Sequence, residues 1–518
     1  MSTFPWLTVL TLLPLISGIV VLGLGAGQKR LARGIGLSTS LMTLGLVLLL
    51  WRQFVPGIGE FQFPERHTWI AVLGVDYRLG VDGLGLLMLL LSALVFPMSL
   101  LASWNIEERV PTYFGLMLLL QAGLFGTFTA LNFFHWFFFW ELSLIPAFFL
   151  IKFWGGPARS SAATQFFIYT MVGSVAMLLA FLAVYLSTRS FDFVELAEKG
   201  RSGLLLPALA TKLGWYQLTA QRLGLVIFAG AFLGFAVKVP LIPFHTWLPT
   251  AYAEAPTGVT MLLTGLMSKM GVYGFLRVLL PIFPQQMRWV ITPLLWVAVF
   301  TIVCSAAAAF VQRDLKRMLA YSSINHLGYC LLGVFAVMSS STFSSAPQLE
   351  KTAALNGVFL QMFNHGLTAA TLFWFLGLLE QRSGGLRGVA DFGGLRRVAP
   401  VFCGLMGIAL FSSLGLPGLN GFVGEFLIFK GAFPLAKWAA CLAVIGLLLT
   451  AVFILTLLQR VFNGPLNAKW SSLPDLSSTE RALVLPAVAL IFVLGIYPQA
   501  LIGVINSTVM QMVQYLRF

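Results

Sequence analysis

Long runs of apolar residues, separated by short polar segments, account for most of this chain. A helix that crosses a bilayer needs about 20 apolar residues, because each residue advances the helix by about 1.5 Å. Fourteen stretches meet this requirement, and none shows the apolar–polar alternation of a membrane β-strand. The pattern therefore predicts an all-α polytopic membrane protein with about 14 transmembrane helices. Their approximate ranges are 4–25, 34–52, 81–103, 112–130, 132–153, 162–186, 222–248, 257–281, 288–311, 317–341, 354–380, 398–433, 437–461 and 481–505.

Two of these stretches contain helix breakers. The seventh contains Pro240 and Pro243, and the twelfth contains Gly415 and Pro417. Proline removes a backbone donor and clashes with the preceding turn, so both helices are expected to break at membrane depth. Because the breaks lie five helices apart, we predict two five-helix repeats that run in opposite directions through the membrane. The predicted divisions are residues 1–111 (peripheral helices 1–3), 112–281 (first repeat, helices 4–8), 282–462 (second repeat, helices 9–13) and 463–518 (helix 14 and tail).

Composition and charge agree with this class. Hydrophobic residues make up 58% of the chain and charged residues 10%, against roughly 25% charged in a soluble domain. The net charge is +14, but the basic residues gather at helix ends, as in 29–33, 313–317 and 387–397. Basic residues there anchor helices against anionic headgroups. The charge therefore predicts contact with lipid and not with nucleic acid.

The four cysteines do not form a cofactor motif. Cys304, Cys330, Cys403 and Cys441 are scattered through apolar stretches, whereas an iron–sulfur cluster or a zinc site needs clustered ligands. The GLGAG segment at 23–27 ends a membrane helix and does not follow a strand, so it lacks the context of a dinucleotide loop. We therefore expect no cofactor and no metal in this chain.

Four charged residues lie inside apolar stretches: Glu141, Lys238, Lys269 and Glu425. One such charge at the bilayer centre costs about 2.5–3.5 kcal/mol on insertion scales, so each needs a partner, water or a changed protonation state. This pattern predicts a proton or cation pathway. Lys238 is the expected partner of Glu141, and the alternative is a static ion pair between helices 5 and 7.

Histidines extend the pathway. His326 titrates closest to neutral pH, and Ser322 lies one turn before it on the same face; a buried core histidine is the competing interpretation. With Lys269 as a relay and Glu425 as the final acid, one continuous polar axis across the membrane plane is predicted. Possible accessory residues are His365, within helix 11, and His245 and Glu254, where an access role competes with simple capping; His135 and Arg277 are weaker candidates.

Several segments together resemble one known family. They are KVPLIPFHTWLP (238–249), EAPTG (254–258), SKMGVYGFLR (268–277), RDLKRMLAYSSINHLG (313–328), FNHGLTAATLF (363–373), SLGLPGLNGFVGEF (413–426) and LQRVFNGP (458–465). The chain resembles the chain-4 antiporter-like subunit of respiratory complex I and of its photosynthetic relative in cyanobacteria and chloroplasts. The resemblance implies a fourteen-helix fold, other membrane subunits as partners, and iron–sulfur clusters and quinone on those partners. It also implies a pumping role for five residues: Glu141, Lys238, Lys269, His326 and Glu425.

Segments 4–15 and 77–94 look closer to the cyanobacterial and plastid type. That likeness implies a thylakoid location and a ferredoxin-linked or NAD(P)H-linked plastoquinone reductase of the NDH-1 type. Gln165, Thr250 and Tyr252 depart from the family pattern and suggest a divergent paralogue, such as that of the carbon-dioxide-uptake variants. The alternative function is a subunit of a multi-subunit Na⁺/H⁺ antiporter, and a third is a structural scaffold.

Overall fold

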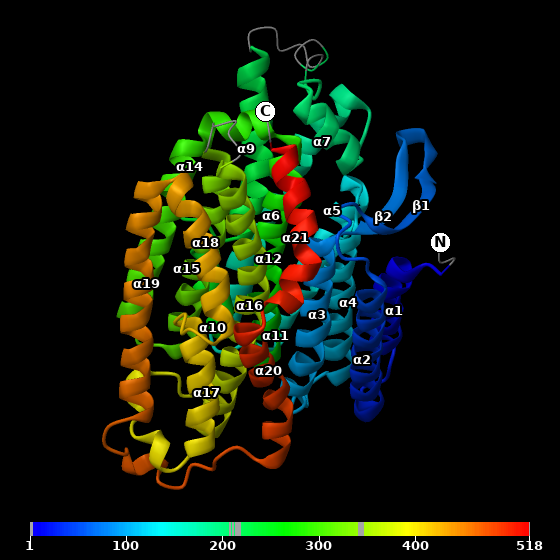
Figure 1. Cartoon of the computed structure of the whole chain (residues 1–518). Helices are drawn as coiled ribbons and strands as arrows, with labels where there is room; N and C mark the ends of the chain where they lie inside the picture. The colour runs from blue at the N-terminus through cyan, green and yellow to red at the C-terminus, as the bar shows by residue number, and fades with distance from the viewer. Residues whose placement is uncertain (1–3, 207–208, 210–211, 213–218, 340–345, 517–518) are drawn as a thin grey trace.

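Helices running roughly side by side form nearly all of the molecule (Figure 1). The computed structural model describes the chain except residues 1–3, 207–208, 210–211, 213–218, 340–345 and 517–518. The helices in chain order are α1 (Trp6–Leu22), α2 (Lys29–Gln53), α3 (Gly83–Ala102), α4 (Val110–Thr129), α5 (Phe133–Trp154), α6 (Arg159–Thr188), α7 (Phe193–Arg201), α9 (Ala220–Lys238), α10 (Trp247–Glu254), α11 (Thr257–Leu262), α12 (Ser268–Gly274), α13 (Leu280–Ile282), α14 (Pro284–Val311), α15 (Leu315–Ser339), α16 (Ala346–Arg382), α17 (Pro400–Ser413), α18 (Asn420–Leu435), α19 (Lys437–Leu457), α20 (Ser478–Ile496) and α21 (Gln499–Tyr515).

The prediction of an all-α membrane protein is confirmed. Among the described residues, 12 helical segments are long and apolar enough to cross a membrane, and α1 and α17 are shorter apolar helices. The predicted helix at 481–505 appears as two helices, α20 and α21, because the chain turns at Tyr497–Pro498 between them. Proline lacks the backbone donor that would continue the helix.

Both predicted helix breaks are present. The seventh span consists of α9 and α10, separated by residues 239–246, and the twelfth consists of α17 and α18, separated by 414–419. In Figure 1, α9 begins at the end of the bundle that carries α7 and descends to α10, whereas α17 lies at the opposite end and leads up to α18. The two broken helices therefore run in opposite directions, as an inverted repeat requires. The exact domain boundaries stay a prediction.

The polar segment after α2 folds into a β-hairpin that the sequence pattern did not predict. Strands β1 (Gln62–Ile70) and β2 (Val75–Val81) pair antiparallel, with a left-handed Gly74 (φ +63°) at the turn. Glu65 of β1 accepts hydrogen bonds from the backbone amides of Leu7 and Thr8, at 2.7 and 3.1 Å. A carboxylate satisfies free amides at a helix N-terminus, so the hairpin is fastened to α1. The end of the bundle that carries β1, β2 and α7 is called the hairpin end below (Figure 1).

The most buried span passes through the centre of the molecule. It extends over Thr257–Ile282 and is completely buried within its apolar window. It includes two π-helical turns, η2 (Leu263–Met267) and η3 (Phe275–Leu279), on either side of α12. Outer helices such as α19 and α20 are only about one-third buried, as lipid-facing helices are. Lys269 of the predicted axis lies on this central span.

Candidate functional site

Lys269 lies at the midpoint of the central span and is fully buried. Its ammonium group donates to the carbonyl of Thr264, within the π-helical turn η2, and lies 3.3 Å from the Ser268 hydroxyl. It also lies 2.8 Å from Nδ1 of His365 on α16. A π-helical turn leaves carbonyl groups less regularly paired than an α-helix does, so the helix itself provides an acceptor for the lysine. Lys269 is thus held within proton-transfer distance of a histidine.

Two histidines continue the path from Lys269. The rings of His365 and His326 lie 5.0 Å apart between centroids, tilted by 36°. His326 is 1% exposed and His365 is 7% exposed. Among the described residues no hydrogen bond joins the two rings, so proton transfer between them would need a ring rotation or an intervening water. The sequence assigned His365 only an accessory role, whereas the structure places it between Lys269 and His326.

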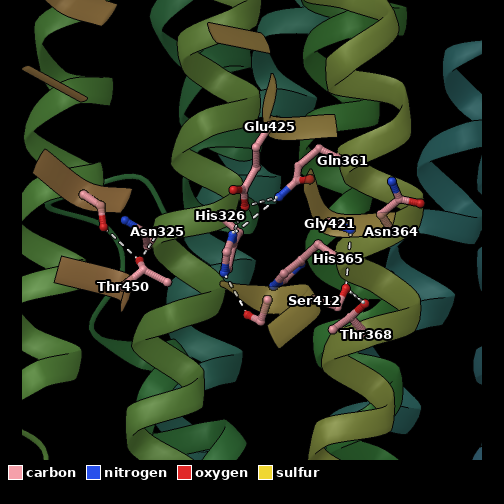
Figure 2. Close-up of polar contacts among 12 residues, drawn as sticks. Asn325, His326, Gln361, Asn364, His365, Thr368, Ser412, Gly421, Glu425 and Thr450 are labelled. Atoms are coloured by element: carbon pink, nitrogen blue, oxygen red, sulfur yellow. Dashed lines mark hydrogen bonds and ion pairs between the residues drawn. The ribbon is translucent and has the colours of Figure 1, made fainter. Parts of the chain in front are cut away.

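His326 is joined directly to Glu425 (Figure 2). Its Nδ1 lies 2.9 Å from Oε1 of Glu425, and its Nε2 lies 3.0 Å from the Ser413 hydroxyl. The amide of Gln361 donates to the same Glu425 oxygen at 3.2 Å. A histidine held between a carboxylate and a hydroxyl can bind a proton on one nitrogen and release one from the other. The search for charged residues within apolar stretches did not identify Gln361 or Ser413, although Gln361 lies four residues before His365 on the same helix face.

The helix break at 414–419 positions Glu425. Gly415 adopts φ +83°, and a Cβ at this position would lie 2.9 Å from Oε2 of Glu425. Across the break, the Ser412 hydroxyl donates to the side-chain carbonyl of Asn420 at 2.6 Å, and Asn364 donates to the Asn420 backbone carbonyl at 2.6 Å. The Gly421 amide, which the interrupted helix leaves without an intrahelical partner, donates to the Ser412 hydroxyl at 3.4 Å (Figure 2). A cavity of about 450 Å³ borders Glu425 between α18 and α19.

Gly424 allows α18 to approach α16 closely enough for the hydrogen bond between Gln361 and Glu425. A Cβ there would lie 2.9 Å from the backbone nitrogen of Gln361. Gly424→Ala should therefore push α16 away, weaken the Gln361–Glu425 hydrogen bond and cost about 1–3 kcal/mol of stability. Gly404→Ala is the matched control, because a Cβ at Gly404 of α17 meets nothing within 4 Å. Thermal unfolding of the solubilised protein measures the difference, and equal transition temperatures for both variants would contradict this packing role.

Glu141 and Lys238 are both buried at their charged atoms, but they are not in direct contact. No ion pair within 4 Å joins them, and neither Lys238 Nζ nor the Glu141 oxygens has a hydrogen-bond partner among the described residues. Lys238 Nζ lies 4.8 Å from the centre of the Trp140 ring, in a cation–π arrangement. The structure therefore gives no support to a static ion pair between helices 5 and 7. Any coupling between the two charges has to pass through water or through movement of Lys238.

The first helix break positions Lys238. Lys238 is the last residue of α9, where free carbonyl groups favour a positive charge. The indole of Trp247 donates to the Val237 carbonyl at 3.0 Å and so satisfies one of these groups. A Cβ at Gly271 would lie 2.7 Å from the Val239 nitrogen. Glycine at 271 therefore lets α12, which carries Lys269, pack directly against the break that carries Lys238.

The remaining accessory candidates lie away from this axis. Glu254 is buried and lies 3.2 Å from Arg387, and it accepts a hydrogen bond from the Ala158 amide at 2.8 Å. A cavity of about 320 Å³ borders it at the start of the central span. His245 is partly exposed in the first helix break, with its ring 6.3 Å from that of Tyr321. Glu254 is thus both a structural partner of Arg387 and a lining residue of a cavity, and its access role stays a prediction.

The described residues contain no group of three or more His, Cys, Asp or Glu side chains arranged to hold a metal ion. All four cysteines are free. The expectation that this chain holds no redox centre remains a prediction.

Comparison with known proteins places this arrangement in a family. Residues 130–450 match the family described as NADH:quinone oxidoreductase/Mrp antiporter, transmembrane. The NADH-quinone oxidoreductase subunit M of Rhodobacter capsulatus is 35% identical over 513 residues, covering 98% of this chain and 96% of that protein. A chain in respiratory complex I from Thermus thermophilus with bound NADH has a TM-score of 0.84 and 28% identity, over 98% of this chain and 99% of that one. A chain of the Mrp complex from Dietzia sp. has a TM-score of 0.82 at 19% identity, over 99% of this chain and 100% of that one, and shows the shared fold alone. The protein therefore belongs to the antiporter-like membrane subunits of the NADH:quinone oxidoreductase and Mrp antiporter family.

Proposed function

We propose that this chain is the antiporter-like, proton-translocating membrane subunit of a complex I-type NADH-quinone oxidoreductase. In this proposal protons move along Glu141, Lys238, Lys269, His365, His326 and Glu425, and other subunits carry out the redox chemistry. Two buried contacts carry the proposal. Lys269 Nζ lies 2.8 Å from Nδ1 of His365, and Nδ1 of His326 lies 2.9 Å from Oε1 of Glu425. Membership of the family and the 35% identity to a subunit M support it.

Electrostatic repulsion couples the neighbouring groups of the axis. Two like charges at the 5.0 Å separation of the His365 and His326 rings repel by about 3 kcal/mol at an effective dielectric constant of about 20. A free-energy change of that size alters a proton-binding equilibrium by about a hundredfold or more. A proton arriving on His365 therefore promotes release of the proton that His326 shares with Glu425. The arrangement moves protons only if an outside event changes the charge at the Glu141 end.

Glu254 is proposed as a residue of the uptake route. The cavity of about 320 Å³ beside it lies at the Thr257 end of the central span, and Lys316 and Glu380 also line it. Lys316 and Glu380 form an ion pair at 2.5 Å. Charged walls of both signs favour water in the cavity. Protons that reach Glu254 would then lie at one end of the helix that carries Lys269.

Which quinone the complex reduces is a narrower prediction than quinone reduction itself. The prediction of a plastoquinone-reducing, thylakoid complex, or of a carbon-dioxide-uptake paralogue, rests on segments 4–15 and 77–94 and on departures such as Gln165. The relative from Rhodobacter capsulatus is named for NADH and quinone without specifying plastoquinone. The proposal therefore rests on quinone reduction as a class. Extraction and mass analysis of the quinone in the purified complex tests the narrower prediction.

Purification of the intact assembly through a tag on this chain tests the proposed function. Subunits with iron–sulfur clusters, together with NADH-dependent quinone reduction and acidification in vesicles, are the expected result. Small antiporter subunits, with Na⁺-dependent proton movement and no electron transfer, would support the alternative function as a subunit of a Na⁺/H⁺ antiporter.

We also predict that this chain, separated from its partners, has no visible absorbance and no bound metal. The cysteines Cys304, Cys330, Cys403 and Cys441 are dispersed, whereas clusters need grouped thiolates. Optical spectra and elemental analysis of the separated subunit provide the measurement. One flavin, haem or metal ion per chain would overturn the prediction.

A further inference from the structure

A second cavity lies at the hairpin end of the molecule. Its volume is about 480 Å³, and residues of β1, β2, α7 and α21 line it. Charged side chains of both signs face it, among them Glu60, Arg66, Arg78 and Arg201. Because removing such charges from water costs several kcal/mol for each ion, water is expected beside these side chains, whereas Phe61, Leu131 and Phe193 form an apolar part of the lining. It lies at the opposite end of the central span from the cavity beside Glu254, since Arg277 and Pro281 line it.

A buried ion pair forms the inner wall of this cavity. Asp82 and Arg277 are in direct contact and are 2% and 8% exposed. Nε of Arg277 has no hydrogen-bond partner among the described residues, and the guanidinium group lies 4.8 Å from the centre of the Phe61 ring. A buried ion pair contributes little net stability, because desolvation offsets most of its Coulomb attraction. A purely structural role therefore explains poorly why two charges lie at this depth.

The ion pair lies on the same helix as the central lysine. Lys269, Tyr273 and Arg277 follow one another at intervals of four residues, so they occupy successive turns of one face. Eight residues of helix correspond to about 12 Å. Tyr273 is 1% exposed, and its hydroxyl donates to the Phe128 carbonyl at 3.2 Å. Arg277 lies within the π-helical turn η3, and Lys269 lies two residues after the end of the turn η2. Such turns are common at functional sites.

We propose that the cavity at the hairpin end is an aqueous vestibule for Lys269, and that the Asp82–Arg277 ion pair closes its inner end. Opening of the pair connects the vestibule with the face of the central span that carries Tyr273 and Lys269. Protons then have a second route to Lys269, distinct from the Glu254 side. This inference rests on the proposed function for its purpose, but it concerns access of water and is testable without any measurement of pumping.

The chain offers a matched pair of variants. Asp82 caps α3 by accepting from the Gly85 amide at 3.0 Å, and asparagine caps a helix equally well. Asp82→Asn therefore removes the charge and keeps the cap. Asp192→Asn is the control: Asp192 also pairs with an arginine of the cavity wall, Arg78, and also caps a helix, α7. Both variants lose one Arg–Asp attraction, but only the first opens the inner end.

Cys330 provides a native reporter. It is buried on α15, which packs against α12, the helix that carries Lys269, and it remains after Cys304, Cys403 and Cys441 are replaced by alanine. Open membrane fragments of the assembled complex are treated with a small, membrane-impermeant methanethiosulfonate, and the rate of Cys330 labelling is measured. Gln511→Cys, on the vestibule wall, is the marker for access to the cavity itself.

The expected result is rapid labelling of Gln511→Cys in every background. Labelling of Cys330 should be slow in the parent protein and in Asp192→Asn. In Asp82→Asn it should be at least about tenfold faster, a change in the open population that corresponds to about 1.4 kcal/mol. Equal Cys330 rates in Asp82→Asn and Asp192→Asn would overturn the proposal, as would a Gln511→Cys that is not labelled. A loss of pumping elsewhere in the axis would change none of these rates, so failure of the proposed function is distinguishable.

Discussion

Glu141→Gln should remove most of the proton translocation that depends on this subunit, while the complex still assembles. The glutamine keeps the volume and polarity of the side chain but cannot bind or release a proton. A positioned acid or base accelerates proton transfer by about 10²–10⁴-fold, so its loss leaves the step far too slow for turnover. The measurement is vesicle acidification per electron transferred to quinone. The structure strengthens this expectation, because both Glu141 oxygens are buried and, within the described part of the chain, have no hydrogen-bond partner that would fix them in a structural role.

Lys238→Met should produce a similar loss if the two residues work together. Lys238 Nζ is also buried, has no hydrogen-bond partner in the residues that the structure describes, and lies over the Trp140 ring. Glu198→Gln is the matched control for the acid, since Glu198 is exposed on α7 and lies outside the axis. Normal acidification per electron in Glu141→Gln vesicles would mean that the first half of the axis starts at another residue.

Glu425→Gln should reduce pumping and, in a tightly coupled complex, quinone-reductase turnover as well. Glutamine at this position can still bond to Gln361, but it cannot exchange a proton with His326, which lies 2.9 Å away. A reversible pump that cannot release its protons holds back the reaction that drives it. Glu425→Asp keeps the titrating group about one methylene shorter, so it should retain part of both activities.

The informative measurement is the difference in proton pumping between Glu425→Gln and Glu425→Asp. Both variants are measured in assembled complexes, with subunit content checked by quantitative immunoblotting. A difference in acidification that follows the presence of the carboxyl group supports proton transfer. Equal activity in both variants would instead assign Glu425 a packing role beside Gly415 and Gln361, and protons would have to leave elsewhere.

The sequence predicted the membrane class and the helix breaks because both depend on local chemistry. Apolar length determines a span, and Pro240 or Pro417 interrupts a helix wherever it lies. The β-hairpin was missed because its pairing shifts between Gln62 and Glu65 and again between Thr68 and Ile70. Such shifts interrupt the two-residue alternation by which a strand is recognised.

The charged residues were found from the sequence, but their pairing was not. Lys269 and His365 are 96 residues apart and meet only because α12 and α16 pack side by side. Helix periodicity shows which residues share a face, but it does not show which two faces meet. For the same reason, the sequence could not show which charged residues are in direct contact. Glu141 and Lys238, expected to be partners, are not in direct contact, whereas His326 and Glu425 are.

The proton-to-electron ratio of three assembled complexes, carrying Glu141→Gln, Glu425→Gln and Glu198→Gln, tests the central claim most directly. The claim is that one continuous axis joins Glu141 to Glu425. It predicts that both axis variants lose pumping to the same extent, because a proton path fails wherever it is interrupted, and that Glu198→Gln pumps normally. A normal ratio in either axis variant, with the subunit present at its usual level, would contradict a continuous axis.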